Sequence, residues 1–361
     1  MKNKNILFFC PREVNVTMGG IERVTDSLAR YLIRNGYNVV FMSVEHTSDK
    51  EYECVAPQYF TKSDGNERWI LEIIDKHQID VVINQMGFFT YCPKESLPQQ
   101  VKVVTVMHDS YYAMYPHLNL NFLRTWNWKR VMKKSLKHTY DQSDKIVVFV
   151  PEFRDEYRFF CPYAKDDKFV IIPNFNSFDN VNADNKEKKV LWVGRHAQTH
   201  KRTNDMIDVW EKLESRFPDW SLDILGDGPD GDTVRAHLAK KNLSRCYLRG
   251  VQDPKSYYES ASIVCVTSAY ESWCMILTEG MQHGCVPMAY DSYTAVRHII
   301  HDGNDGLLVT PFDVEEYADK LAHLMENEEQ RNRLSAAAVE SVKQYDAENV
   351  MPKWLELIES L

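Results

Sequence analysis

The sequence predicts two α/β domains in tandem, each a doubly wound parallel sheet with helices on both faces. Strand-like apolar runs alternate with helix-like segments through both halves of the chain, and this alternation is typical of parallel sheets. A polar run rich in Asn and Asp, 174–188, interrupts the alternation and indicates a linker. The length of 361 residues also favours two domains over one.

The first predicted domain spans 1–174 and opens with an apolar strand at 5–10. The next segment, 20–35, carries apolar residues at the three- and four-residue spacing of an amphipathic helix. The other elements expected in this domain are strands at 39–43, 81–84, 101–107 and 145–150, and a helix at 69–77.

The second predicted domain spans 187–345 and repeats the pattern after the linker. A last amphipathic segment, 354–361, predicts a helix within 346–361 that packs back on the first domain. Strands are expected at 190–194, 222–226, 247–250, 262–267, 286–290 and 306–309, and helices at 203–217, 234–241, 314–326 and 329–345. A ligand-binding cleft is expected between the two domains.

Charge and cysteine content narrow the function classes. The formal net charge of −9 argues against nucleic acid as a partner. The eight cysteines contain no C-x-x-C pair, which favours buried reduced thiols over a disulfide framework or a zinc site. No apolar run approaches the ~20 residues of a membrane span, and the N-terminal apolar run is too short for a secretory signal. We therefore expect a cytoplasmic protein.

Two glutamates, Glu271 and Glu279, are the most informative residues. The apolar run 262–267 predicts a strand before Glu271, and helix formers surround Glu279 until Gly284. The first carboxylate should follow a strand, and the second should lie about two turns along the next helix at ~3.6 residues per turn. Ligands of open α/β sheets bind at this edge, and free N–H groups at a helix start bind phosphate. A chance pair of helix-forming glutamates is the alternative.

Other residues at strand ends point to an anion. Gly19 and Gly20 separate the first strand from its helix, where glycine lets backbone N–H groups approach a ligand, unless this is an ordinary turn. Arg195 and Lys201 follow the strand at 190–194 and would suit a diphosphate, unless they lie on a solvated basic turn. His108 ends the strand at 101–107, facing the predicted cleft or serving a structural role.

Taken in order, these features resemble the retaining glycosyltransferases of the GT-B fold, the large nucleotide-sugar-dependent group of family 4. The resemblance covers almost the whole chain and is strongest from 190 to 309. The residues that carry it are Gly19-Gly20, His108, Pro173-Asn174, Val193-Gly194-Arg195 with Lys201, Gly226-Asp227-Gly228, and Glu271 to Glu279.

The resemblance implies a role for each matching residue of the second domain. Arg195 and Lys201 match the cationic pair on the donor diphosphate. Glu279 matches the glutamate that binds the ribose hydroxyls, and Glu271 the one that faces the donor sugar. The backbone of Cys274, Met275 and Ile276 matches the helix start that meets sugar or phosphate, and Gly250-Val251 matches the base pocket. The turn Gly226-Asp-Gly228 is expected to be structural.

In the first domain, the resemblance implies that the Gly19-Gly20 loop contacts the diphosphate and that His108 lies near the sugar and the reaction centre. No metal and no cofactor other than the nucleotide sugar is expected, because no Asp-x-Asp stands directly at a strand end; Asp230-Gly-Asp232 begins only four residues after the strand expected at 222–226.

The sequence departs from the family pattern at three places. Ser272-Trp-Cys274 stands where small residues such as Gly-Phe-Gly usually follow the first glutamate. Arg202 replaces the glycine that usually follows Lys201. Asp291-Ser-Tyr-Thr-Ala295 replaces a Gly-rich loop with a glutamate. These changes touch the sugar pocket and leave the phosphate cations intact, so the donor sugar stays open.

The segment 121–140 has no acidic residue, although the protein is acidic overall. Its basic residues and its Trp, Phe and Leu side chains suit the anionic surface of a membrane, or else it is a domain helix with solvated lysines. Its basic residues are Arg124, Lys129, Arg130, Lys133, Lys134 and Lys137.

The expected activity is transfer of a sugar from a nucleoside diphosphate sugar, with UDP favoured by its commonness, to a saccharide or lipid-linked saccharide. Cell-surface polysaccharide or lipopolysaccharide biosynthesis is the expected setting, with peripheral attachment to the inner face of the plasma membrane. Two alternatives stay open, namely a sugar-nucleotide epimerase on the same fold and a non-catalytic protein that binds nucleotide sugars.

Overall fold

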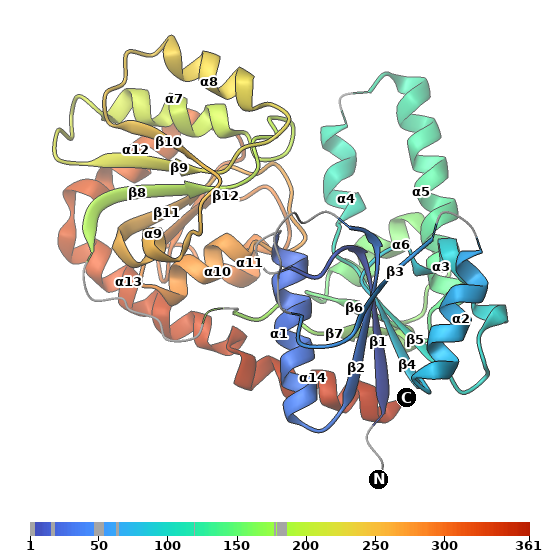
Figure 1. Ribbon diagram of the computed structural model, residues 1–361. Coiled ribbons are helices and arrows are strands. Elements are labelled where there is room, and N and C mark those ends of the chain that lie inside the picture. Colours follow the sequence, from blue (N-terminus) through green and yellow to red (C-terminus); the bar gives the residue numbers. More distant parts are fainter. Residues whose placement is uncertain are drawn as a thin grey trace. The chain divides into compact units, whose positions relative to one another are not determined.

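The chain forms two compact units (Figure 1). The computed structural model describes residues 4–15, 19–46, 54–62, 65–118, 120–176, 178 and 186–361. The first unit comprises Met1–Tyr112, Leu120–Ser177 and Ala347–Leu361, and the second comprises Ala113–Asn119 and Phe178–Asp346. The structure thus groups Ala113–Asn119 with the second unit, whereas the sequence places this segment within 1–174.

The first unit is built on a seven-stranded parallel sheet with the order β3-β2-β1-β4-β5-β6-β7. The chain moves outward from β1 to β3 and then returns to place β4 on the other side of β1, so the sheet reverses its direction between β1 and β4. Its strands are β1 (Asn5–Arg12), β2 (Asn38–Glu45), β3 (Gln58–Phe60), β4 (Val81–Asn84), β5 (Lys102–Val106), β6 (Lys145–Val148) and β7 (Phe169–Ile171).

Helices cover both faces of this sheet because crossovers between parallel strands are right-handed. Helices α1 and α14 lie on one side, and α2 and α3 lie on the other (Figure 1). The helices are α1 (Gly20–Arg34), α2 (Asn66–Lys76), α3 (Phe88–Tyr91), α4 (Tyr111–Met114), α5 (Phe122–Gln142), α6 (Phe153–Phe160) and α14 (Ala347–Ser360).

The C-terminal helix α14 belongs to the first unit. Lys4 Nζ donates to the carbonyl oxygen of Ile358 at 2.8 Å, and the Tyr37 hydroxyl donates to Glu359 Oε1 at 3.1 Å. Trp354 is buried. Polar contacts to the residues just before β1 and just before β2 therefore accompany the buried apolar face of α14.

The second unit is built on a six-stranded parallel sheet with the order β10-β9-β8-β11-β12-β13, which reverses between β8 and β11. One large core packs α7 and α12 against one face, and a smaller core lies under α9 and α10. The strands are β8 (Glu187–Val193), β9 (Ser221–Leu225), β10 (Cys246–Gly250), β11 (Ala261–Val266), β12 (Val286–Tyr290) and β13 (Leu307–Val309), and the helices are α7 (Thr203–Leu213), α8 (Gly231–Ala239), α9 (Lys255–Ser260), α10 (Met275–Gln282), α11 (Val296–Ile299), α12 (Val314–Glu326) and α13 (Glu328–Val342).

The second unit also includes Ala113–Asn119. The His117 ring lies 5.9 Å from the Tyr270 ring in a stacked arrangement and 5.5 Å from the Phe312 ring, edge to face.

The elements that the sequence does not predict are short. They have too few residues to display a hydrophobic period, and they are β3, β7, α3, α4, α6, α9 and α11. β8 begins at Glu187, inside the run predicted as a linker, and positions 177 and 179–185 of that run lie outside the described residues.

The last helix is longer than the amphipathic segment 354–361 from which it is predicted. It begins at Ala347, within the expected range 346–361, and continues through Pro352. Val350 and Met351 are buried, and their packing outweighs the backbone hydrogen bond that the proline removes. None of the helices among the described residues is long and apolar enough to cross a bilayer.

A glycine turn after β9 fits tightly against the loop after β8. Gly226 has φ +121°, and a Cβ added to it would lie 2.0 Å from the carbonyl oxygen of Gly194. A Cβ on Gly228 would lie 2.7 Å from Cγ of Arg195 and 2.6 Å from the carbonyl oxygen of His196. The turn is therefore structural, as the sequence predicts, and it sets the path of the chain that carries Arg195.

We expect Gly226→Ala to destabilise the second unit by more than the ~1–2 kcal/mol of left-handed backbone strain alone, because the new methyl group overlaps Gly194. Gly303→Ala is the matched control, since Gly303 has φ +74° but no atom within 4 Å of its Cβ position. Thermal unfolding of both variants measures the difference. Equal losses of stability would contradict the steric argument.

Candidate active site

The predicted site residues of the second unit gather where its sheet reverses. β8 lies between β9 and β11, and all these strands are parallel. Arg195 and Lys201 follow β8, and Glu271 follows β11. The loops after these two adjacent strands lead to opposite faces of the sheet. The crevice between them, at the carboxyl ends of the strands, is where ligands of open α/β sheets bind.

Lys201 and Glu271 form the central contact of this site. The Lys201 ammonium donates a short hydrogen bond to Glu271 Oε1. The Ser268 hydroxyl donates to the same oxygen at 2.7 Å, and His200 Nε2 lies 3.6 Å from it. The side chains of Lys201 and Glu271 are only 16% and 11% exposed, so water screens their attraction weakly.

Each member of this pair stabilises the charged form of the other. Burial acts to raise the pKa of Glu271, but the Lys201 ammonium and the His200 ring outweigh it and hold that pKa at about 2. Burial acts to lower the pKa of Lys201, but the Glu271 carboxylate outweighs it and raises that pKa. Glu271 is therefore ionised at neutral pH and is not poised to donate a proton.

A buried threonine joins the two loops beneath the ion pair. The Thr267 hydroxyl accepts from Trp192 Nε1 of β8 at 3.0 Å and donates toward the carbonyl oxygens of Lys201 and Arg202, at 2.8 Å and 3.1 Å. The backbone N–H of Ala269 donates to the carbonyl oxygen of His200 at 2.7 Å. The Thr267 hydroxyl and the Ala269 N–H therefore fix the backbone that carries Lys201.

Arg195 extends its side chain into solvent next to this pair. Its positive charge acts to lower the pKa of Lys201, although the effect of Glu271 is larger. One carboxylate thus faces two cations, and the arrangement can accept further negative charge.

Arg202 occupies the position where the family pattern has glycine, and its backbone explains that preference. Its φ of 51° is left-handed, a conformation that glycine adopts without strain. The guanidinium donates to Asp205 at 2.7 Å and lies 4.4 Å from the centre of the Phe312 ring. These two contacts hold the arginine side chain in place at the start of α7.

Glu279 lies inside α10, as predicted, and is completely buried. Its Oε2 accepts a hydrogen bond from the Tyr258 hydroxyl at 3.1 Å. Tyr258 stacks on the ring of His283, and His283 Nδ1 lies 2.8 Å from the backbone oxygen of Glu279. The structure therefore places the second glutamate beneath the surface, among aromatic rings.

The start of α10 and the end of β10 hold the remaining predicted residues of the second unit. Cys274 is the N-cap residue of α10, and Met275 and Ile276 form its first turn. Gly250 ends the edge strand β10, and its carbonyl oxygen accepts from the backbone N–H of Gly226 at 2.7 Å. Val251 is 75% exposed.

In the first unit, Gly19 and Gly20 begin α1 after β1. A Cβ on Gly19 would lie 2.8 Å from Oε2 of Glu22, whose carboxylate is buried and forms an ion pair with Arg12 at 2.8 Å. The glycine loop thus lies against a carboxylate whose charge Arg12 offsets.

His108 follows β5, and its Nε2 lies 2.5 Å from Oε1 of Gln85. Burial lowers the pKa of His108 to about 4, so the ring is neutral at pH 7. An amide oxygen only accepts hydrogen bonds, so Nε2 carries the proton and Nδ1 carries a lone pair.

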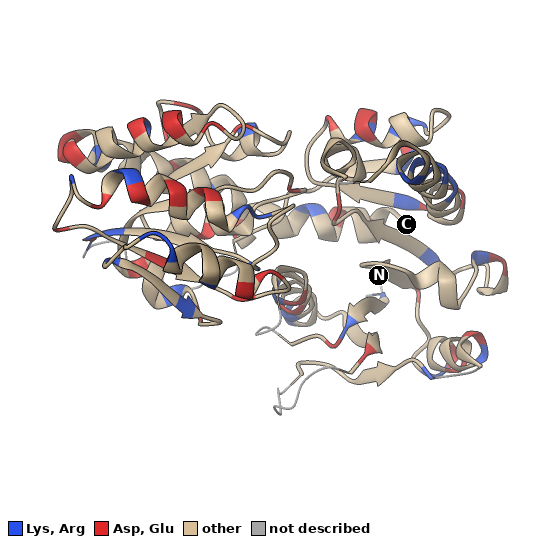
Figure 2. Cartoon of the chain, turned by 90° about the horizontal axis from the view of Figure 1, so that it is seen from above, with Lys and Arg blue, Asp and Glu red and all other residues tan. Residues whose placement is uncertain are grey.

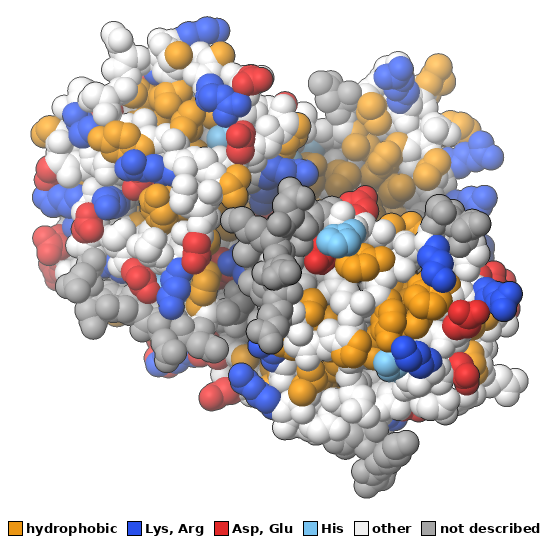
Figure 3. Space-filling view, viewed as in Figure 1, with side chains coloured by type: hydrophobic (Ala, Val, Ile, Leu, Met, Phe, Trp, Pro, Cys, Tyr) orange, Lys and Arg blue, Asp and Glu red, His pale blue; other side chains and the backbone are white. Residues whose placement is uncertain are grey.

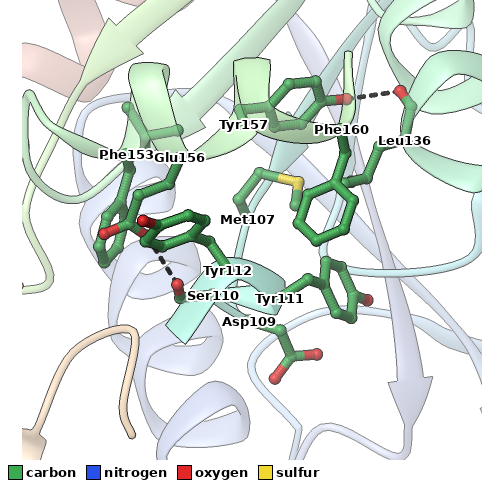
Figure 4. A pocket seen from close by; sticks show the side chains of 11 residues that line it. Met107, Asp109, Ser110, Tyr111, Tyr112, Leu136, Phe153, Glu156, Tyr157 and Phe160 are labelled. Carbon is green, nitrogen blue, oxygen red and sulfur yellow. Dashed lines mark hydrogen bonds between the residues drawn. The ribbon is translucent and has the colours of Figure 1, made fainter. Parts of the chain in front are cut away.

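Two adjoining pockets of the first unit open beside His108 and along α5. The polar pocket has a volume of about 690 Å³, and His108, Gln85, Ser135 and His138 are among its lining residues. The second, of about 300 Å³, is lined mainly by aromatic and apolar side chains from the segment after β5 and from α4, α5, β6 and α6 (Figure 4). In that pocket the Ser110 hydroxyl donates to Glu156 at 2.7 Å, and the Tyr157 hydroxyl donates to the carbonyl oxygen of Leu136 at 2.7 Å.

Several residues of these sites escape sequence reasoning. Gln85 follows β4 directly, and a rule that inspects every residue after a strand would have found it. Ser268 precedes Glu271 by three residues and carries no signal of its own. The role of Thr267 also could not be predicted, because only the order of strands in the sheet brings its hydroxyl next to Trp192 and to the loop that carries Lys201.

Comparisons with known proteins match this chain to glycosyltransferases. A family model described as glycosyl transferases group 1 matches residues 174–341, and a model of glycosyltransferase family 4 matches residues 18–176. An uncharacterised glycosyltransferase of Haemophilus influenzae is 25% identical over 93% of this chain and 95% of its own length. The amylovoran biosynthesis glycosyltransferase AmsD of Erwinia amylovora is 28% identical over 94% of this chain and 96% of its own.

A solved structure shares the fold. The structure of Anabaena HepE in complex with UDP-glucose superposes with a TM-score of 0.78 at 14% identity, covering 99% of this chain and 100% of that one. The two parallel α/β units are therefore those of the GT-B fold. The chain belongs to the GT-B glycosyltransferases of family 4, as its resemblance predicts.

We expect the contribution of Glu271 to stability to depend on pH. Its pKa in the folded protein, about 2, lies below its ordinary value of 4.5. The stability that ionised Glu271 contributes is therefore fully present above pH 4.5 and is lost as the pH falls toward 2. Urea unfolding of the wild type and of Glu271→Gln should differ by about 2–3 kcal/mol at pH 7, and the difference should shrink as the pH falls through 3 and vanish only below about pH 2.

The matched control for this measurement is Glu315→Gln, because the Glu315 side chain is 76% exposed and pairs with Lys212 at the surface. Its difference from the wild type should stay small across the same pH range. A difference for Glu271→Gln that does not change with pH would contradict the ion-pair account.

Proposed function

We propose that this chain is a retaining, metal-independent hexosyltransferase that moves a sugar from a nucleoside diphosphate sugar, UDP by preference, to a saccharide or lipid-linked saccharide. The observation that carries the proposal is the buried Lys201–Glu271 pair with Arg195 beside it, where the second sheet reverses. This arrangement combines spare positive charge for a diphosphate with one ionised carboxylate.

The second unit would stabilise the two charges that develop during transfer. As the bond between the anomeric carbon and the diphosphate oxygen breaks, negative charge grows on the diphosphate, where Arg195, Lys201 and the first turn of α10 would offset it. Positive charge grows on the sugar ring, and the ionised Glu271 would face it. Glu279 would bind the ribose hydroxyls after the side chains that bury its carboxylate in this structure move aside.

The configuration of the sugar would be retained by attack on the same face. The acceptor hydroxyl forms the new carbon–oxygen bond while the diphosphate leaves, and a diphosphate oxygen takes the acceptor proton. His108, whose ring is kept neutral by burial that lowers its pKa to about 4, would lie near the sugar and the reaction centre. A glycosyl adduct trapped on the protein would contradict this route.

The relatives support the choice of substrates. The Erwinia relative is named for amylovoran biosynthesis, and the Anabaena structure holds UDP-glucose. We therefore place the reaction in the synthesis of a cell-surface polysaccharide or glycolipid, with UDP-hexoses as the first donors to test.

Helix α5 would attach the protein to the inner face of an anionic membrane. Among the exposed large apolar residues of the chain, Phe122, Leu123 and Trp126 are 81%, 72% and 57% exposed, and all lie in the first turns of α5. Basic and hydrophobic side chains lie next to each other there (Figure 3), and basic residues line this helix (Figure 2). Apolar and basic groups side by side suit a lipid surface.

We expect nucleoside diphosphate to bind and to be released in an acceptor-dependent reaction. Thermal unfolding with UDP, GDP and ADP should show a shift with one of them, since a ligand at a hundred times its dissociation constant adds ~2.7 kcal/mol. Glu279→Gln, which keeps the shape of the buried side chain, should weaken that shift.

The alternatives to a transferase are distinguished by the products formed from a nucleotide sugar with and without a saccharide acceptor. A transferase releases the diphosphate faster when a saccharide acceptor is present, whereas an epimerase returns a changed sugar nucleotide without acceptor. A binding protein leaves the sugar nucleotide intact. Glu315→Gln, on the exposed surface, serves as the control and should leave both the shift and the release unchanged.

We also expect vesicle binding to depend on the charge of α5. Replacing Arg130, Lys133 and Lys134 with glutamine should lower partitioning into vesicles that contain phosphatidylglycerol by about 100-fold, at ~1 kcal/mol per basic residue. Lys129 is left unchanged because its ammonium packs 4.1 Å from the Phe159 ring centre. Cosedimentation measures the partitioning.

The matched control removes three exposed charges elsewhere, by replacing Lys240, Lys343 and Lys353 with glutamine. This variant has the same net charge as the α5 variant and should keep its binding. Equal binding by the wild type and the α5 variant would contradict attachment through α5.

A further inference from the structure

Two segments that depart from the family pattern meet beside Glu271. Strands β11 and β12 are parallel neighbours, so their carboxyl ends bring together the loop after β11 and the segment Asp291-Ser-Tyr-Thr-Ala295. The Ser292 hydroxyl donates to the carbonyl oxygen of Ser268 at 2.7 Å. The second departure, Ser272-Trp-Cys274, leads into α10 on the same side.

The contact between these segments is made by Tyr293 and Cys274. Tyr293 is 5% exposed and Cys274 is 2% exposed. Burial raises the pKa of both the phenol and the thiol, and the negative charge of the nearby Glu271 raises them further. The positive charge of Lys201 acts to lower the pKa of Cys274. The two buried side chains therefore lie beside the Lys201–Glu271 pair.

The Tyr293 hydroxyl lacks a strong partner. Among the described residues it has no hydrogen-bond partner, and a thiol such as that of Cys274 would be only a weak donor and a weak acceptor. Oε1 of Glu271 is already engaged by Lys201 and Ser268. Buried hydroxyls nearly always have a partner in folded proteins, so this one is suited to a polar group that arrives with a ligand.

We propose that the Tyr293 hydroxyl, backed by the Cys274 thiol, is a specificity-determining group that hydrogen-bonds one hydroxyl of the donor sugar. This inference rests on the proposed function, in which Glu271 faces that sugar. The ligand chemistry follows from the position, since the groups of a hexose that lie beyond its diphosphate are neutral hydroxyls. A neutral phenol can donate to or accept from such a group without disturbing the ion pair.

The consequence is discrimination between sugars that differ at one carbon. A sugar whose hydroxyl reaches Tyr293 satisfies the buried phenol, whereas an epimer or a sugar that lacks this hydroxyl leaves it unpaired. A site built to bond a substrate hydroxyl rejects the analogue without it more strongly than an apolar site rejects a change in size. The phosphate-binding cations are unaffected by this choice.

The test is calorimetric binding of UDP, UDP-glucose, UDP-galactose, UDP-xylose and UDP-N-acetylglucosamine to the wild type and to Tyr293→Phe. We expect the wild type to prefer one sugar and Tyr293→Phe to lose that preference by about fivefold or more, as for one hydrogen bond. Its affinity for UDP alone should change less than twofold. Binding needs no acceptor, so an unknown acceptor does not limit the experiment.

Tyr317→Phe is the matched control. The Tyr317 hydroxyl is also buried, but it donates to the carbonyl oxygen of Met288 at 2.8 Å in the core. This variant should keep the wild-type preference. Cys274→Ser is the second test variant, because its hydroxyl gives Tyr293 a strong internal partner and should weaken the preference without removing the ring.

Three results would overturn the inference. They are a wild type that binds UDP but shows no sugar preference, a Tyr293→Phe variant whose preference stays within twofold of the wild type, and a loss of affinity that is equal for all sugars. Should Tyr293→Phe fail to fold, an unchanged preference in Cys274→Ser overturns it instead. A wild type that binds none of these nucleotides contradicts UDP as the donor base, which is a failure of the proposed function and is seen before any variant is compared.

Discussion

The candidate site of the second unit depends on the way that β8 and β11 end side by side. The chain leaves these neighbouring strands toward opposite faces of the sheet, so the loops that follow them would separate unless something joined them. Thr267 provides that connection, because its buried hydroxyl contacts the indole of Trp192 on β8 and the carbonyl oxygens of Lys201 and Arg202. The ion pair of Lys201 with Glu271 then closes the same two loops at the surface. Backbone geometry, rather than side-chain charge, therefore decides where the lysine is placed.

The placement of Lys201 beside Glu271 in turn determines the charge of both side chains. A carboxylate as buried as Glu271 would lose its charge if it stood alone, because burial raises the pKa of a carboxyl group. Lys201 and His200 reverse that tendency and hold the pKa at about 2. The lysine is thus already paired, and Arg195, whose side chain is exposed, supplies the positive charge that is not matched locally. An arrangement of two cations and one carboxylate favours an incoming diphosphate and still leaves negative charge where a positive sugar ring would develop.

Much of this could be predicted from the sequence, because the informative signals are local. The glutamate after a strand, the glutamate inside the next helix, and the cations after β8 are read from short stretches whose strand or helix character is visible in their hydrophobic period. The contacts of Tyr258 with Glu279 and of Gln85 with His108 could not be predicted, since they join residues whose proximity follows from strand order. The complete burial of Glu279 also could not be predicted, because the sequence of an apolar helix does not show which aromatic rings pack around a glutamate within it. The hydrophobic period of 354–361 shows only the last part of α14, which begins at Ala347 and continues through Pro352 with Val350 and Met351 buried.

The departures from the family pattern fall into two kinds that physical chemistry separates. Arg202 replaces a glycine at a left-handed position, and the strain that this adds is countered by its contacts with Asp205 and Phe312, so the loop that carries Lys201 keeps its path. Tyr293 and Cys274 place larger, polarisable groups near Glu271, where a small residue would leave room. The first change keeps the path of the loop whose cations we propose to bind phosphate, and the second alters the surroundings of the proposed sugar site. Because a diphosphate is common to all donors while the sugar varies, a chain that keeps the former and changes the latter has the features expected of altered donor selectivity rather than of lost activity.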